Sequence, residues 1–410
     1  MTTIKLDPGA ALLLDALHGA GHAAYAVGGC VRDSLLGQAP HDWDLCTSAR
    51  PEQVMALFGE EKCIPTGLQH GTVTVKQGGR LYETTTFRIE GAYSDGRHPD
   101  AVHFVPDVRE DLARRDFTIN AMAYSAEEGL IDPFGGRGDL AAHLVRAVGE
   151  PERRFEEDAL RILRLYRFAA RFGFSVDPAT GAAARALGPH LDCVSAERIQ
   201  EEMLKLLAAP APGRYLEPAV LAVILPELYP LEEPARFAES CRVIDRLAPG
   251  AENVPARLAA LLLPLGEEGT RKALRRLKCS NALTEETAVL VREIGTSGSA
   301  TDPAVSVRRL LGRYGLTAVE RLAALGAAGH PEQAADFAAR AELARQMEAD
   351  GVCCRIAQLA VNGRDLMAAG AKPGPGLRQL LEQLLEAVIT GQVPNEKQAL
   401  LAAAAQFSAS

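Results

Sequence analysis

Two aspartates separated by one tryptophan form the part of the sequence best suited to bind a metal ion. Asp42 and Asp44 occupy positions i and i+2 in the stretch HDWDLCTS. In an extended strand these two side chains emerge on one face, whereas Trp43 and Leu45 point to the opposite, buried face. Two carboxylates held so close repel each other, so either one is protonated or a divalent cation lies between them. A solvated strand end is the alternative interpretation.

A glycine turn precedes the aspartates and is suited to binding phosphate. The apolar run 23–27 stops at Gly28 and Gly29, and helical character follows over 31–36, which predicts a strand, a turn and a helix. Glycines permit close backbone approach, and the free N–H groups at a helix start favour phosphate. Arg32 adds a fixed positive charge, so a triphosphate would fit. A turn with a purely structural role is the alternative.

A third carboxylate belongs to a predicted β-hairpin. Residues 71–87 alternate apolar and polar side chains on both sides of Gln77-Gly78-Gly79, which predicts two antiparallel strands joined by a tight turn. Glu83 lies on the second strand, where it could join the aspartates as a ligand of Mg²⁺ ions that bridge the phosphates of a nucleotide. A surface glutamate without a chemical role is the alternative.

Composition indicates a large, mainly helical protein. The chain has 410 residues, and a single core rarely grows beyond about 250–300 residues, so we expect several domains. Abundant Ala, Leu, Glu and Arg after about residue 140 predict that the C-terminal two-thirds is helical. No apolar run is long enough for a membrane span, and the N-terminus lacks a signal-peptide pattern. We therefore expect a cytoplasmic protein without membrane contact.

The net charge and the spacing of the cysteines limit which partners and metals the sequence suggests. The net charge of −9 argues against indiscriminate binding to polyanions but permits a local basic surface, for which residues 271–278 and 307–315 are candidates. The eight cysteines are scattered, without the spacing of a zinc site. We expect them to be reduced and mostly packed thiols.

Several ordered motifs resemble a known family. The glycine turn and the aspartate pair resemble the polymerase-beta-like nucleotidyltransferases. Later segments narrow the resemblance to class II tRNA nucleotidyltransferases, which comprise the CCA-adding enzymes and bacterial poly(A) polymerases. These segments are DLARRDFTINAMAYS (111–125), LIDPFGGRGDL (130–140), FEEDALRILRLYRFAARFGF (155–174) and SAERIQEEMLKLL (195–207). Near the C-terminus, LAVNGRDLM and GQVPNEK resemble the tail of bacterial CCA-adding enzymes.

The resemblance implies an α+β fold, in which a nucleotidyltransferase head with a mixed β-sheet precedes all-α neck, body and tail domains. We place these domains at residues 1–140 (catalytic head), 141–205 (neck with a base-reading helix), 206–300 (body) and 301–410 (tail, binding tRNA). Stretches rich in Pro, Gly or Ser at 208–213 and 296–303 are the candidate linkers.

The resemblance also implies the site residues. It assigns Asp42 and Asp44 as ligands of Mg²⁺, with Glu83 joining them as a catalytic carboxylate. The residues expected near the incoming triphosphate are Gly28, Gly29, Arg32 and Arg115. The residues expected on the base and phosphates of the nucleotide are Asp158, Arg161, Arg164 and Arg167.

The segment from Glu157 to Ala170 lacks Gly and Pro and is predicted to be one helix, with Asp158 and Arg161 as close neighbours on its polar side. A solvated ion pair is a common origin of this pattern. Cytosine and adenine, however, both present an exocyclic amino donor beside an unprotonated ring nitrogen, so an Asp acceptor beside an Arg donor can pair with either base. Uracil and guanine instead present a keto acceptor beside a ring N–H, which does not match this pair. Such a pair would select CTP and ATP without a template.

The leading hypothesis is a template-independent tRNA nucleotidyltransferase that adds CCA to tRNA 3′ ends from CTP and ATP. A bacterial poly(A) polymerase, or an A-adding or CC-adding enzyme, shares the head motifs and is the alternative. A non-catalytic RNA-binding protein is the hypothesis from another class, and the intact aspartate pair argues against it. Residues 88–104 resemble the mobile loop of complete CCA-adding enzymes, which favours the leading hypothesis. The sequence defines no oligomeric state.

Overall fold

The computed structural model of the chain describes residues 3–91, 102–228, 234–296 and 302–407. The chain divides into two compact units, Met1–Pro230 and Leu231–Ser410. The predicted linker at 208–213 lies inside the first unit, and the one at 296–303 lies largely outside the described residues. The four domain bounds proposed from the sequence stay predictions.

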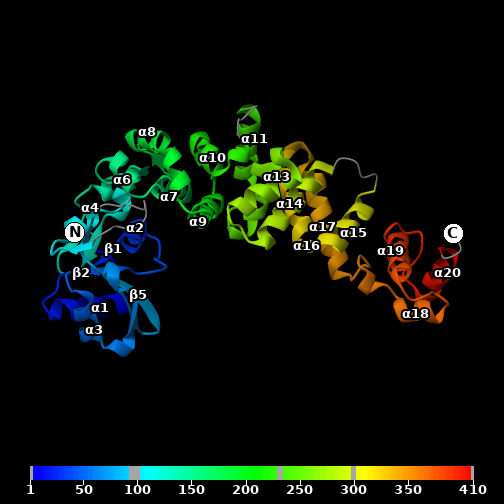
Figure 1. Cartoon of the computed structure of the whole chain (residues 1–410), viewed down its shortest axis with the longest axis horizontal. Coiled ribbons are helices and arrows are strands. Elements are labelled where there is room, and N and C mark those ends of the chain that lie inside the picture. Colours follow the sequence, from blue (N-terminus) through cyan, green and yellow to red (C-terminus); the bar gives the residue numbers. More distant parts are fainter. Residues whose placement is uncertain (1–2, 92–101, 229–233, 297–301, 408–410) are drawn as a thin grey trace. The chain divides into compact units, whose positions relative to one another are not determined.

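The first unit contains a seven-stranded sheet in the order β3-β4-β5-β2-β1-β8-β9. Figure 1 labels three of these strands, β1, β2 and β5. The strands are β1 (Ala24–Val27), β2 (Leu45–Thr47), β3 (Cys63–Gly67), β4 (Thr72–Gln77), β5 (Arg80–Thr86), β8 (Ala123–Ser125) and β9 (Gly129–Ile131). Strands β2 and β5 are parallel, and all other neighbours are antiparallel. The predicted mixed sheet is therefore confirmed.

Local sequence patterns account for the elements that carry the predicted site. The predicted hairpin is confirmed, because β4 pairs with β5 around Gly78 and Gly79, whose φ angles are 57° and 80°. These left-handed values are easy only for residues such as glycine. The predicted strand, turn and helix over 23–36 is also confirmed, as β1 leads through Gly28 into helix α2 (Gly29–Leu35).

Helix α1 (Pro8–Gly19) is tied to the sheet at its first turn. The carboxylate of Asp7 accepts hydrogen bonds from the backbone N–H groups of Gly9 and Ala10, and Pro8 occupies the first turn. The same carboxylate accepts from the hydroxyl of Tyr82 and from Arg80 on β5. Helix α1 also packs against α3 (Pro51–Phe58) and strands β1 and β2 (Figure 1).

The remaining elements of the first unit are short helices and two small sheets. The larger elements are α4 (Val108–Ala113), α5 (Gly136–Ala141), α6 (Pro151–Glu157), α7 (Leu160–Phe172), α8 (Pro178–Ala186), α9 (Ala196–Leu207) and α10 (Pro218–Ile224). Strands β10 (Leu144–Val145) and β11 (Ser175–Val176) are parallel, and β6 (Arg88–Glu90) and β7 (Val102–Phe104) are antiparallel. The segment 88–104, which resembles a mobile loop, lies outside the described residues over 92–101.

The prediction of one continuous helix from Glu157 to Ala170 is wrong. Helix α6 ends at Glu157, Asp158 is extended at φ −149° and ψ 103°, and α7 begins at Leu160. The physical reason is local, because Oδ1 of Asp158 accepts the backbone N–H of Leu160 at 3.1 Å. Aspartate competes in this way with the helical hydrogen bonds and favours a helix start over a helix interior.

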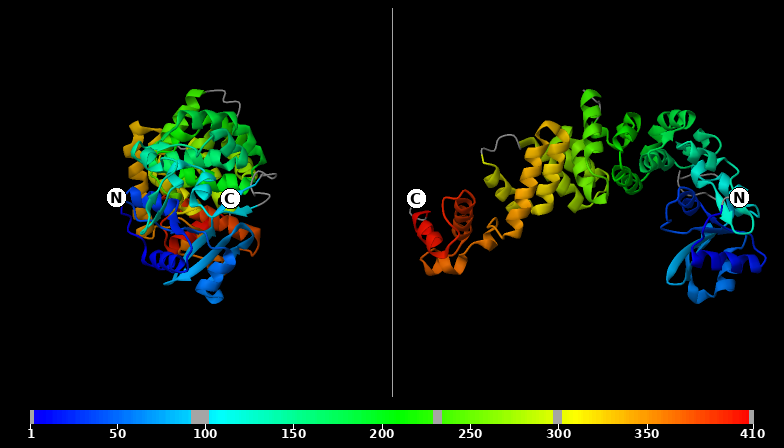
Figure 2. Two further views of the ribbon diagram at one scale, coloured as in Figure 1. Left: turned by 90° about the vertical axis from the view of Figure 1, so that its left-hand side faces the viewer. Right: turned by 180° about the vertical axis from the view of Figure 1, so that it is seen from behind.

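The described part of the second unit is entirely helical, as predicted (Figure 2). Its α-helices are α11 (Pro234–Arg246), α12 (Val254–Leu262), α13 (Gly266–Arg276), α14 (Asn281–Thr296), α15 (Pro303–Tyr314), α16 (Leu316–Gly329), α17 (Ala334–Ala349), α18 (Gly363–Ala368), α19 (Pro375–Ile389) and α20 (Lys397–Phe407). Helix α14 packs on α12 and α13, and α17 packs on α15 and α16. Within the described ranges, no helix is both long and apolar enough to cross a membrane.

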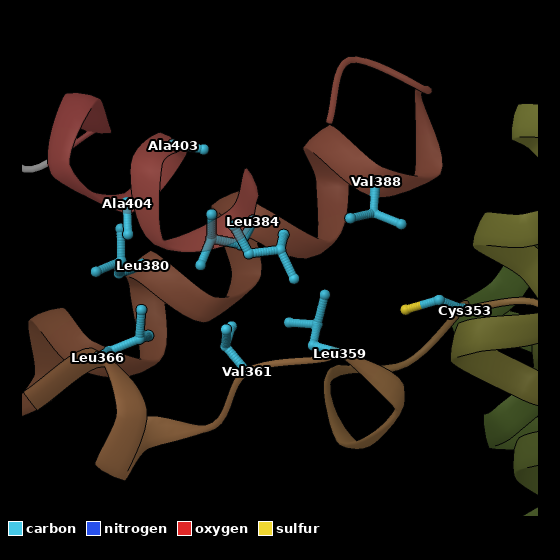
Figure 3. Packing of buried hydrophobic residues seen from close by; sticks show 10 residues of the cluster. Cys353, Leu359, Val361, Leu366, Leu380, Leu384, Val388, Ala403 and Ala404 are labelled. Atoms are coloured by element: carbon cyan, nitrogen blue, oxygen red, sulfur yellow. The ribbon is translucent and has the colours of Figure 1, made fainter. Parts of the chain in front are cut away.

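The last three helices have a core of their own. Leu366, Leu380 and Leu384 are buried in it, together with Cys353 from the preceding segment (Figure 3). Leu400 belongs to the same cluster. The adjacent Cys354 packs instead into the cluster around Leu311 on α15. Five of the eight free cysteines are buried, which confirms the expectation that most of them are packed.

Candidate active site

The aspartate pair lies at the start of a central strand. Asp44 directly precedes β2, and Asp42 lies two residues before Asp44. The prediction that both aspartates lie within the strand is therefore wrong by a few residues, because the strand begins at Leu45. The expected alternation is confirmed, because Trp43 is 6% and Leu45 is 1% exposed, whereas both aspartates are exposed. The alternation orients the two carboxylates to the solvent side of this sheet edge.

Pairing of β2 with β5 brings Glu83, the third predicted carboxylate, alongside Asp44. Leu45 pairs with Thr84 in parallel register, so the preceding residues, Asp44 and Glu83, occupy equivalent positions on neighbouring strands. Glu83 is exposed like the aspartates. The sequence showed that Glu83 lies on a strand, and the strand order places it beside Asp44.

Burial and the neighbouring charged residues change the pKa of Asp44. Its carboxylate is open to solvent on one side, but the surrounding protein atoms reduce its solvation, and this burial raises its pKa to about 6. Glu83 and Asp42 raise the pKa further, whereas Arg115 opposes the rise. Among the described residues, no three or more His, Cys, Asp or Glu side chains are arranged as a metal-binding group. Asp44 nevertheless experiences repulsion from Glu83 and Asp42, which a divalent cation would relieve.

The glycine turn is shaped by Arg115. Gly28 has a φ of 75°, and its N–H donates to the carbonyl of Met122 at 3.0 Å. A Cβ on Gly28 would lie 2.8 Å from Nη1 of Arg115, so only glycine allows the guanidinium to approach. Asp111 holds Arg115 at 3.4 Å, and Nε of Arg115 is buried without a hydrogen-bond partner in the described structure. Arg115 therefore lies against Gly28 and acts electrostatically on Asp44, and the contact of these residues with a nucleotide stays a prediction.

Arg32 points into the protein interior. Its side chain is 4% exposed, pairs with Asp33 at 2.7 Å and donates to Oδ1 of Asn120. Its guanidinium lies 5.3 and 4.8 Å from the ring centroids of Phe168 and Phe172. The charge is thus used within the protein, and direct contact of Arg32 with a triphosphate stays a prediction.

Two arginines of α7 are held by carboxylates from other elements. Arg164 donates from Nε and Nη2 to Oδ2 of Asp116 at 2.9 and 2.6 Å. Burial acts to raise the pKa of Asp116, but Arg164 and a hydrogen bond from Asn120 outweigh it and lower the pKa to about 2. Arg167 pairs with Glu202 on α9.

Asp116 and Glu202 were not identified as site residues from the sequence. The available signal was charge balance: α7 carries four arginines on a helix that is largely buried, and buried charges require partners.

The predicted base-reading pair is separated by its other partners. Asp158 accepts two hydrogen bonds from Arg198 on α9, at 3.2 and 2.8 Å. Arg161 donates to Glu157 at 2.8 Å and to the carbonyl of Arg114 at 3.1 Å. The two residues remain neighbours only through the backbone, where the N–H of Arg161 donates to the carbonyl of Asp158 at 3.0 Å. Their expected side-chain contact is absent from the described structure, and the role of Arg198 was not predicted.

Three protein families match successive parts of the chain. The family described as poly A polymerase head domain matches residues 24–146. One described as a probable RNA and SrmB-binding site of polymerase A matches 173–231, and a putative tRNA nucleotidyltransferase domain 2 matches 252–404. Together with the sheet and its carboxylates, these matches define the protein as a nucleotidyltransferase.

Full-length relatives identify the family more closely. The CCA-adding enzyme of Limosilactobacillus fermentum is 37% identical over 400 residues, which cover 96% of each chain. That of Lactobacillus delbrueckii subsp. bulgaricus is 39% identical over 388 residues, or 95% of each chain. The crystal structure of the Bacillus stearothermophilus CCA-adding enzyme in complex with CTP is 33% identical, with a TM-score of 0.80 and 98% of each chain covered. This chain belongs to the CCA-adding enzyme family.

Proposed function

We propose that this protein adds CCA to tRNA 3′ ends from CTP and ATP without a nucleic-acid template. The observation that carries the proposal is the meeting of Asp44, Glu83 and Arg115 beside the Gly28 turn, in a chain that matches CCA-adding enzymes over its whole length. In the reaction, the 3′-hydroxyl of tRNA attacks the α-phosphate of the nucleotide in line. The bond to the β-phosphate oxygen breaks, and pyrophosphate leaves.

Asp42 and Asp44 would hold a divalent cation, which we take to be Mg²⁺, with Glu83 as a further carboxylate. Oxygen-rich, negatively charged sites of this kind suit Mg²⁺, and the pKa of Asp44 is raised first by burial and then by the charges of Glu83 and Asp42. When bound, the ion supplies activation of the attacking hydroxyl and neutralisation of the leaving group. Arg115 offers its guanidinium charge to the phosphates, and Gly28 leaves room for the guanidinium to lie at the turn.

We further propose that nucleotide selection involves Asp158, Arg161, Arg164 and Arg167. Arg164 and Arg167 are held in place by Asp116 and Glu202, which supports a preorganised site rather than flexible surface charges. Asp158 supplies an acceptor and Arg161 a donor, the combination that cytosine and adenine share and that uracil and guanine lack.

We propose that tRNA phosphates contact the C-terminal end of α13. In the other candidate basic segment, Arg308 donates to the last carbonyls of α19 and Arg309 pairs with Glu386, so both serve the fold. Arg271 is similarly engaged by Glu267, Glu268 and Glu285. The exposed basic side chains of the α13 end are Lys272, Arg275, Arg276 and Lys278. An acidic protein needs such a local surface to bind RNA.

Incubation with tRNA that lacks its 3′ CCA, and with single labelled nucleotides, tests this function. CTP alone should add two residues, and ATP should be incorporated once, after the two C residues. A run of A residues added without C would indicate a poly(A) polymerase instead. Since the substrate is tRNA, we place the activity in the cytoplasm.

A further inference from the structure

The hairpin of β4 and β5 has one covered face and one open face. Tyr82 on β5 is 2% exposed, and its hydroxyl donates to the carboxylate of Asp7 at the start of α1. Leu81 and Glu83 flank Tyr82, so their side chains emerge on the opposite face of the sheet. Both are exposed, and Leu81, at 61%, is the most exposed large apolar side chain of the described residues. The face that carries Glu83 is therefore open to solvent along this part of β5.

Strand β4 adds a positive charge to the open face. Lys76 pairs with Leu81, and Thr74 pairs with Glu83, and residues directly opposite each other on antiparallel strands share a face. Lys76 is exposed, and it forms no ion pair with any residue of the described ranges. It lies two residues beyond Thr74, or roughly 7 Å along the strand. We call the surface formed by Lys76, Leu81 and Glu83 the hairpin face.

The hairpin face and the proposed triphosphate site lie on opposite sides of Asp44. In the sheet order, β5 and then β4 follow β2 on one side, and β1 follows it on the other. Strand β1 is antiparallel to β2 and β5 is parallel to it, so the end of β1 and the start of β5 lie at the same edge as the start of β2. The Gly28 turn, with Arg115 against it, comes directly after β1. Asp44 therefore lies between this turn and the hairpin face.

The geometry of the proposed reaction assigns an occupant to the hairpin face. In an in-line displacement, the attacking hydroxyl and the leaving pyrophosphate lie on opposite sides of the α-phosphate. With the triphosphate at Gly28 and Arg115, the 3′-hydroxyl of the RNA must approach from the side of β5. The nucleotides that precede this hydroxyl are covalently attached to it, so they must lie close to the hairpin face as well.

We propose that the hairpin face binds the single-stranded 3′ end of tRNA, with Lys76 at a backbone phosphate and Leu81 against a base or ribose. The terminal nucleotide changes during CCA addition, so contacts to this end must not depend on the identity of the base. A charge contact to phosphate and an apolar contact both meet that requirement. The inference rests on the proposed function, because it requires that tRNA supplies the attacking hydroxyl.

The first test measures the KM for tRNA of Lys76→Gln. The substitution removes one phosphate contact, so this KM should rise by about threefold to tenfold, and the slope of log KM against log salt concentration should fall by about 0.7. The KM for CTP should not change. Arg80→Gln is the matched control, because it removes a positive charge from the opposite face of the same hairpin, where Arg80 pairs with Asp7 at 2.7 Å. A similar rise in the control would overturn the inference.

Leu81→Ser tests the apolar contact. Leu81 is already exposed, so its loss should not lower the melting temperature. The KM for tRNA should rise by a factor of about three or more, because apolar surface that the RNA covers is removed. The salt dependence should stay as in wild type, because no phosphate contact is lost. Unchanged KM values for tRNA in both Lys76→Gln and Leu81→Ser would overturn the inference.

A comparison of two RNAs shows which part of the substrate the hairpin face binds. A tRNA ending in CC retains its unpaired 3′ end, whereas a tRNA truncated at its last paired nucleotide lacks that end. Lys76→Gln should weaken binding of the first RNA and leave binding of the second unchanged. Equal weakening for both RNAs would place Lys76 on another part of tRNA and overturn the inference.

Failure of the inference can be distinguished from failure of the proposed function. A wild-type protein that adds no nucleotide to tRNA would contradict the proposed function. An active wild type with unaffected Lys76→Gln and Leu81→Ser variants would contradict this inference alone.

Discussion

Arg115 lies against Gly28, so close that a single methyl group on the glycine would come within 2.8 Å of Nη1 of the arginine. The contact joins the turn between β1 and α2 to the segment after α4. Arg115 also opposes the rise in the pKa of Asp44, so the same guanidinium acts on that carboxylate. One arginine thus links the proposed phosphate site to the proposed metal site.

Gly28→Ala should displace Arg115 and impair nucleotide binding. We expect the KM for CTP and for ATP to rise by about tenfold or more, the effect of weakening one charge-assisted contact. Gly37→Ala is the matched control, because Gly37 also has a left-handed φ, 72°, but a Cβ there would meet no atom within 4 Å. Gly37→Ala should lose about 1–2 kcal/mol of stability from its positive φ. Gly28→Ala should lose more, because its ψ of −122° lies outside the left-handed helical region that other residues can reach. Equal KM values in the two variants would refute the role of the close approach.

Asp44→Asn should nearly abolish nucleotide transfer without destabilising the fold. The substitution removes a charge from a crowded group of carboxylates, so the melting temperature should stay the same or rise. Loss of a metal ligand should reduce kcat by about a thousandfold or more. Asp15→Asn, at an exposed position of α1, is the control for loss of a surface charge. Activity of Asp44→Asn within tenfold of wild type would exclude Asp44 as a metal ligand.

Asp116→Asn should destabilise the first unit in a pH-dependent manner. The pKa of Asp116 is lowered from 3.8 to about 2, so its ionised form contributes about 2 kcal/mol above pH 4. That contribution is lost as the pH falls from about 4 towards 2. Urea unfolding of wild type and variant should therefore differ clearly at neutral pH and converge in acid. A constant difference across this range would show that Asp116 acts by packing rather than by charge.

Charge reversal at Lys272, Arg276 and Lys278 should weaken tRNA binding. We expect the KM for tRNA to rise by about tenfold or more, with a shallower dependence on salt, because fewer counterions are released on binding. The comparison variant is Arg309→Gln, which breaks an ion pair with Glu386 and should leave the KM for tRNA unchanged. If only Arg309→Gln affects tRNA binding, the α15 segment is the RNA contact.

The sequence by itself determined the elements whose residues contact one another locally. Alternation around Trp43 and Leu45, and the glycines at 28 and 78–79, follow from periods of two residues and from backbone freedom, which are properties of short segments. The order of the motifs was sufficient to indicate the family, because it is carried by residue identity. Only the tertiary structure decided that Glu83 lies beside Asp44, since this depends on β2 pairing with β5.

Tertiary packing determines which charged residues form ion pairs. Asp158 pairs with Arg198, forty residues away, rather than with Arg161 on the next turn, and Arg164 pairs with Asp116, forty-eight residues away. A helical pattern shows which residues share a face, but it does not show which opposite charge another helix brings to that face. Burial makes such pairing obligatory, because an unpaired charge in the interior is costly. The arginines of α7 therefore pair with carboxylates that other elements bring close to them in the folded chain.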